Sequence, residues 1–228
     1  MHDKTLLELP SLFTPIPLRE AGDAILRAVA LAPTQGAGTL PWVRSLGRVE
    51  VAVVLEPEQP LGTARLALYA AINALADAVA SLGPPEIPVA LRWPATLLVN
   101  AGIAGQARLA TPDGASADAM PDWLVVGVEA RFAIPAGRDP GHDPGRTSLE
   151  AEGWTDTDPT ELTAAWARHL MAGIAEWDRD GPKAVADRFL ARLEQDVETD
   201  GARRGIDLGT ADLIWERDGT RHRRAFGA

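Results

Sequence analysis

The side chains that carry most covalent chemistry are scarce in this chain of 228 residues. It contains no cysteine, so a thiolate nucleophile and a disulfide framework are both excluded. Lysine occurs only as Lys4 and Lys183, and neither follows a glycine, so the Gly-Lys-Ser/Thr of a phosphate-binding P-loop is absent. No G-x-S-x-G nucleophile elbow occurs, and no two of the four histidines have metal-ligand spacing. We therefore predict no metal site, and arginine is the cation available for chemistry.

Charge and hydropathy narrow the class of protein further. The net charge is −10 and the isoelectric point is about 4.9, which argues against nucleic-acid binding because phosphate contacts need clustered Lys and Arg. No apolar run approaches the roughly 18 residues of a membrane span, and residues 1–16 lack the basic and apolar stretches of a signal peptide. With no cysteine to form disulfides, we expect a cytoplasmic protein that binds neither nucleic acid nor membrane.

The elements that would position these arginines follow from hydrophobic periodicity. The clearest is a helix over 60–82, whose apolar stripe is Leu61, Ala64, Leu68, Ile72, Leu75, Val79 and Leu82. We expect this stripe to pack on a mixed sheet that contains 49–56, 88–93 and 123–134. The remaining patterns predict helices over 17–32, 160–178 and 182–196, and strands over 39–44, 48–56, 89–93, 96–99, 103–109, 123–134, 205–208, 212–217 and 220–226.

The order of these elements favours an α+β fold, because runs of strands are separated from runs of helices. A Gly-, Asp- and Pro-rich loop spans 135–158, and loops of that length are commonly functional or disordered. We expect residues 1–200 to form one domain and residues 201–228 to form a small C-terminal β segment.

Several motifs, taken in order, resemble those of one enzyme family. Residues 89–98 (VALRWPATLL) followed by Ile103-Ala104-Gly105 resemble the Lys-Trp-Pro-Asn-Asp strand and Lys-x-x-Gly turn of biotin protein ligases. Residues 121–128 (PDWLVVGV) resemble the family's V-V-x-G-x-G strand, and Thr147-Ser148-Leu149 resembles its A-T-S-L turn. The stretch 205–214 resembles the start of its small SH3-like C-terminal domain. Over about residues 17–216 the chain resembles the biotin/lipoate A/B protein ligase family, in a divergent bacterial branch.

The resemblance implies a fold and an activity. The fold would be the mixed sheet with packed helices shared by class II aminoacyl-tRNA synthetases and biotin ligases. The substrate would be a small carboxylic acid, biotin or lipoate, which reacts with ATP and magnesium to give an acyl-adenylate. The acyl group would then pass to the lysine of a biotinyl or lipoyl carrier domain.

The same resemblance assigns site residues. It implies that Arg92 is the catalytic cation, in place of the family's strand lysine. Strand alternation sends Leu91 and Trp93 to one face of the sheet and Arg92 to the other. A guanidinium on that face could hold a carboxylate or phosphate with two hydrogen bonds. The implied substrate-binding residues are Gly36, Gly38, Thr39, Arg44, Trp93, Gly105, Thr147 and Ser148.

The chain also departs from the family pattern. The glycine loop reads Gly36-Ala37-Gly38-Thr39 without the family's two loop arginines, Asn-Asp is replaced by Ala95-Thr96, and the second lysine is replaced by Gly102 or lost. These changes leave alternatives open. One is a catalytically attenuated protein that binds an acid or a nucleotide, and another is a scaffold for a carrier domain.

Overall fold

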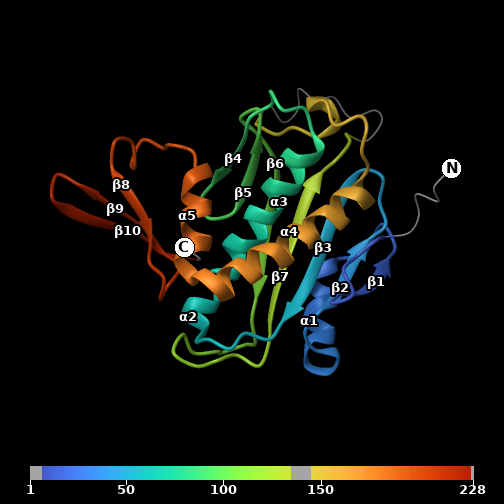
Figure 1. The fold of residues 1–228 in the computed structure, drawn as a ribbon, viewed down its shortest axis with the longest axis horizontal. Coiled ribbons are helices and arrows are strands. Elements are labelled where there is room, and N and C mark those ends of the chain that lie inside the picture. Colours follow the sequence, from blue (N-terminus) through green and yellow to red (C-terminus); the bar gives the residue numbers. More distant parts are fainter. Residues whose placement is uncertain (1–6, 135–144, 227–228) are drawn as a thin grey trace.

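The computed structural model describes residues 7–134 and 145–226, and its main sheet has seven strands in the order β1-β2-β3-β7-β6-β5-β4 (Figure 1). β1 and β2 pair in parallel and all other neighbours are antiparallel, so the sheet is mixed as predicted. The strands are β1 (Thr14–Leu18), β2 (Thr39–Val43), β3 (Arg48–Leu55), β4 (Val89–Arg92), β5 (Thr96–Val99), β6 (Gly102–Ala110) and β7 (Leu124–Arg131). Part of the predicted loop, residues 135–144, lies outside the described residues.

One face of this sheet, which we call the inner face, carries the main core. Val49, Val51 and Val53 of β3 belong to a single buried cluster with the helices α3 (Ala67–Leu82), α4 (Pro159–Asp180) and α5 (Pro182–Arg192). The predicted stripe of the central helix is buried there, since Leu68 is 5% exposed and Ile72, Leu75 and Val79 are 0% exposed. The predicted packing of this helix on the sheet is confirmed.

The central helix is interrupted once. A single helix over 60–82 was expected, but α2 (Leu61–Ala64) and α3 are separated at Arg65 and Leu66. By length and composition the stretch Leu61–Leu82 is also a possible membrane span, which the sequence-based expectation did not foresee, although 72% of its most apolar window is buried in the fold. A buried core helix meets the same criteria, because it too is apolar on all sides.

The opposite face, which we call the outer face, is only partly covered. Here α1 (Ala24–Gln35) buries Ala24, Ala28 and Ala32 against Ala52 and Val54 of β3 in a second, smaller cluster. Gly127 of β7 allows this close approach, because a Cβ there would lie 2.6 Å from Ile25. The part of the outer face that α1 does not cover remains open.

The predicted helix over 17–32 was placed too early. Residues 14–18 form the edge strand β1, where Pro15 and Pro17 are tolerated because an edge strand need not donate every N–H. The helix begins at Ala24 because the Asp23 carboxylate accepts the Leu26 N–H at 2.9 Å. It continues through Pro33 to Gln35, since a proline in the last turn costs a single backbone hydrogen bond.

The C-terminal residues form a second sheet of three strands, β10-β9-β8. It comprises β8 (Arg203–Ile206), β9 (Leu213–Arg217) and β10 (Thr220–Arg224), and Figure 1 shows it beside α5, away from the main sheet. The hydroxyl of Tyr69 in α3 donates to the Ala211 carbonyl at 2.6 Å, and the indole of Trp93 donates to that hydroxyl at 3.1 Å. The buried bond from Tyr69 to Ala211 joins the C-terminal segment to the main body.

Candidate functional site

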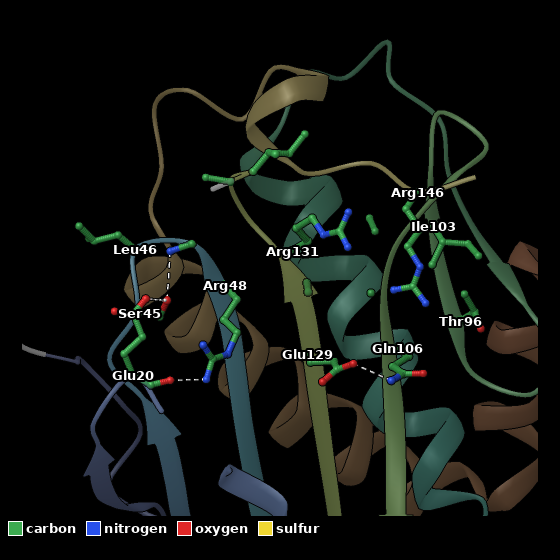
Figure 2. A pocket seen from close by; sticks show the side chains of 16 residues that line it. Glu20, Ser45, Leu46, Arg48, Thr96, Ile103, Gln106, Glu129, Arg131 and Arg146 are labelled. Atoms are coloured by element: carbon green, nitrogen blue, oxygen red, sulfur yellow. Dashed lines mark hydrogen bonds between the residues drawn. The ribbon is translucent and has the colours of Figure 1, made fainter. Parts of the chain in front are cut away.

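A cavity of about 620 Å³ lies on the open part of the outer face (Figure 2). Its floor is formed by β6 and β7, and its sides by the turn 45–47 and by Arg146, which follows the long loop. The register explains the polar floor: Thr96, Gln106, Glu129 and Glu50 are successive cross-strand partners, so they share the outer face. This volume is within the range of about 300–1,000 Å³ that is usual for small-molecule sites.

Three arginines line this cavity, which we call the arginine-lined cavity. Arg48 and Arg131 are direct partners in the β3–β7 register, and Arg146 faces them from the other side in Figure 2. Arg48 is neutralised by Glu50 at 2.8 Å and also donates to the Glu20 carbonyl at 2.5 Å. Within residues 7–134 and 145–226, Arg131 has neither an ion pair nor a side-chain hydrogen bond, although it is half-buried. The cavity therefore holds a cation that its own carboxylates do not neutralise.

The carboxylates of the cavity already have hydrogen-bond partners. Gln106 donates to Glu129 at 2.6 Å, and Arg108 approaches the other oxygen of Glu129 at 3.7 Å from outside the cavity. Glu20 accepts the Ser45 hydroxyl at 3.0 Å. Because these carboxylates already have partners, the arrangement favours an anionic ligand near Arg131 and Arg146.

Apolar groups complete the walls of the cavity. Ile103, Ala104 and Ala130 lie among its lining residues, and Leu46, at the tip of the 45–47 turn, is 85% exposed. Such an exposed leucine beside a cavity provides apolar surface that a ligand could cover. A molecule with an apolar part and an anionic group fits both kinds of lining.

Among the residues implied by the resemblance, Gly105 lies in this cavity. A Cβ at Gly105 would lie 2.4 Å from the Glu129 carbonyl oxygen, so the glycine allows β6 and β7 to approach at the cavity floor. Thr147 and Ser148 are buried directly after Arg146, and the Thr147 N–H donates to the Ile103 carbonyl at 3.0 Å. They hold the segment that presents Arg146 and do not themselves line the cavity.

Gly36, Gly38 and Thr39 lie at the other end of the sheet. Gly38 donates its N–H to the Val54 carbonyl at 2.9 Å, near the end of β3, whereas Arg48 begins β3. At about 3.3 Å per residue these ends are roughly 23 Å apart. Arg44 is exposed and its N–H donates to the Leu18 carbonyl. The structure therefore does not bring Gly36, Gly38 and Thr39 to the arginine-lined cavity, whereas Arg44 directly precedes the lining residue Ser45 but does not itself line the cavity.

Arg92 and Trp93 do not line the cavity, although Arg92 is the cross-strand partner of Thr96, which does. The alternation is as predicted, since Leu91 is buried and Arg92 is exposed. However, the segment after α5 runs beside the edge strand β4, and Glu194 forms an ion pair with Arg92 there. Hydrogen bonding to Glu194 raises the pKa of Arg92. Trp93 lies under the Arg224 guanidinium, 5.7 Å from its ring centroid, at the junction with the second sheet. A ligand contact of Arg92 stays a prediction.

Arg131, Arg146, Gln106 and Glu129 were not predicted as site residues from the sequence. A signal was present in the strand pattern, because Arg48-x-Glu50 and Glu129-x-Arg131 place charges on alternate positions of otherwise apolar strands. The segment that supplies Arg146 could not be found in this way, since it reaches the cavity only through its pairing with β6. No group of three His, Cys, Asp or Glu residues within the described ranges could hold a metal ion.

The chain matches a known protein family and a known relative in sequence. The model of the biotin/lipoate A/B protein ligase family matches residues 9–191. A biotin--[acetyl-CoA-carboxylase] ligase from Paracoccus denitrificans is 30% identical over 167 residues, which are 72% of this chain and 68% of that protein.

Solved structures agree with this result. A biotin protein ligase-like protein of unknown function from Silicibacter sp. superposes with a TM-score of 0.80 at 26% identity, and 96% of each chain is covered. The biotin protein ligase from Aquifex aeolicus in complex with biotin and ATP has a TM-score of 0.68 at 15% identity over 94% of this chain and 96% of that one, and this likeness shows a shared fold. The α+β fold expected from the sequence, that of class II synthetases and biotin ligases, is confirmed. The chain belongs to the biotin/lipoate A/B protein ligase family.

Proposed function

We propose that the protein binds biotin or lipoate together with ATP in the arginine-lined cavity and joins them as an acyl-adenylate. The observation that carries this proposal is the half-buried Arg131 without a carboxylate partner among the described residues, opposite Arg48 and across the cavity from Arg146. A guanidinium stays charged at any working pH and can hold a carboxylate or a phosphate with two hydrogen bonds.

In this reaction an oxygen of the acid's carboxylate bonds to the α-phosphorus of ATP, and the bond to pyrophosphate breaks. Negative charge grows on the phosphate oxygens during the step, and fixed cations beside them stabilise it. Arg131 and Arg146 are suited to this role, while Ile103 and Leu46 could cover the apolar part of the acid. Magnesium would arrive with the nucleotide, and the acyl group would pass to the lysine of a carrier domain.

The lysine content favours a second candidate function, binding of the acid without adenylate formation. Lys183 forms an ion pair with Asp187 on α5, and no lysine is among the described residues that line the cavity. The two candidates differ in how ATP and the acid influence each other. An adenylating enzyme should bind them synergistically, whereas an acid-binding protein should bind the acid equally well with or without ATP.

Isothermal titration with biotin, lipoate and ATP, alone and in pairs, together with an assay of pyrophosphate release, tests both. Synergy with pyrophosphate release would establish the ligase, and acid binding without either would establish the binding protein. Failure of all these ligands to bind the folded protein would refute both candidates.

A further inference from the structure

A second and larger cavity, of about 880 Å³, lies near the other end of β3, between the sheet and α4. Its apolar walls include Phe13, Leu55 and Leu124 on the sheet side and Met171 and Ile174 on α4. All five side chains belong to the main core or pack against it, yet Leu55, Met171 and Ile174 remain partly exposed. Because Val53 of the inner face lines it, this cavity is separate from the arginine-lined cavity on the outer face.

The rim of this groove has the opposite charge to the first cavity. Its described lining residues include the carboxylates Glu56, Glu58 and Asp178 and no Lys, Arg or His, and we call it the acid-rimmed groove. None of the three carboxylates forms an ion pair within the part of the chain that the structure describes. An apolar groove with unneutralised carboxylates at its rim is complementary to a ligand with an apolar chain and a cationic head.

One residue in the wall of the groove has an unsatisfied hydrogen-bond donor. Trp177 lines the groove and is 8% exposed, and its buried indole N–H has no acceptor among the described residues. Buried donors are nearly always satisfied in folded proteins, so this one is unusual. By contrast, the indoles of Trp154 and Trp166 donate to helix carbonyls at 2.9 and 3.1 Å.

We propose that the acid-rimmed groove binds an amphipathic cation, an alkyl or acyl chain that ends in a protonated amine or a quaternary ammonium group. The chain lies between α4 and the sheet, and the head lies at Glu56, Glu58 and Asp178. This site does not depend on the function proposed for the arginine-lined cavity.

Titration calorimetry with decyltrimethylammonium and with the uncharged decyldimethylamine oxide separates charge recognition from simple burial of an apolar chain. We expect the cation to bind with one site per chain and at least ten-fold more tightly than the uncharged probe, a difference of about 1.4 kcal/mol. Added salt should weaken it, since screening acts on exposed charges. Equal affinity for the two probes, or no binding of the cation, would overturn the proposal.

Matched variants on α4 locate the site. Ala175 lines the groove and is exposed, whereas Ala172 is exposed on the same helix and does not line it. Ala175→Trp should abolish binding of decyltrimethylammonium, and Ala172→Trp should leave it unchanged. Binding that survives Ala175→Trp in a folded protein would place the ligand elsewhere.

A second pair tests the rim and controls for the acidity of the whole protein. Asp178→Asn should weaken binding about two- to five-fold, the range for exposed ion pairs. Asp180→Asn removes an equal charge that pairs with Arg179 outside the groove and should have no effect. Equal effects of both variants would indicate general attraction to an acidic surface and would contradict the site. Titration of these variants with biotin and ATP should be unchanged, so the two proposals can fail separately.

Discussion

Arg48 and Arg131 lie directly opposite each other on neighbouring antiparallel strands, at the cavity end of the outer face. Like charges at such positions repel, and Glu50 compensates the charge of Arg48 alone. The pair therefore costs some stability in the absence of an anion. A ligand that carries a carboxylate or phosphate would remove this cost, which links the pairing to function.

Arg131→Ala should weaken binding of the acid or of ATP by about 1.5–3 kcal/mol, the range for a hydrogen bond to a charged group. The free energy of unfolding should change by less than about 0.5 kcal/mol, because the lost side chain has no partner among the described residues. Calorimetry and thermal unfolding measure the two effects. Arg108→Ala is the matched control, because Arg108 is exposed on the same face and does not line the cavity. Equal losses in both variants would argue against a site at Arg131.

Arg92→Ala decides between the role implied by the family resemblance and the ion pair in the structure. If the main role of Arg92 is its ion pair with Glu194, then Arg92→Ala and Glu194→Gln should each lower the free energy of unfolding by no more than about 1 kcal/mol. The double variant should lose little more than either single variant. Ligand affinity should then be unchanged in all three. A large loss of affinity in Arg92→Ala and in the double variant, but not in Glu194→Gln, would show instead that Arg92 contacts the anion.

Tyr69 should make stability fall at alkaline pH. Burial raises the pKa of this phenol above its ordinary value, so the folded protein holds the proton more tightly than the unfolded chain. The resulting stability is complete below the unfolded pKa of about 10 and is lost as the pH rises above it. Tyr69 is the only tyrosine, so tyrosinate absorbance reports it directly. Titration near the ordinary pKa in the folded protein would contradict this prediction.

Tyr69→Phe should cost about 1–3 kcal/mol of stability, because the Trp93 indole and the Ala211 carbonyl both lose a partner. It should also flatten the alkaline fall in stability. Urea unfolding at neutral and alkaline pH measures both effects. A variant as stable as the parent would show that water replaces the hydroxyl at this junction.

Gly105→Ala should destabilise the protein by about 1–3 kcal/mol, the usual cost of overpacking. The new methyl group would meet the backbone of Glu129 at 2.4 Å, and a backbone atom of the neighbouring strand cannot move aside easily. Gly173→Ala is the control, because α4 has open space there and alanine favours a helix by about 0.5–1 kcal/mol. If both variants were equally stable, β6 and β7 would not be as closely spaced as described.

The sequence by itself determined the element types and the family. Strong periodicity predicted the central helix and the strands around Val51 and Val126, because burial of an apolar stripe or run depends mainly on local pattern. The ordered motifs from Arg92-Trp93-Pro94 to Thr147-Ser148 were enough to indicate the ligase family. The start of α1 was missed because one side chain, Asp23, fixes it.

The tertiary structure decided which residues share a site. Strand register brings Arg131 opposite Arg48, although they are far apart in the chain, and pairing with β6 brings Arg146 to the same cavity. The same folding places Glu194 beside Arg92 and sends Gly36 and Gly38 to the opposite end of the sheet. Motif resemblance gives residue types in order, whereas the position of a charge in space depends on register and edge pairing. These arise from contacts between segments distant in sequence, which a local pattern cannot specify.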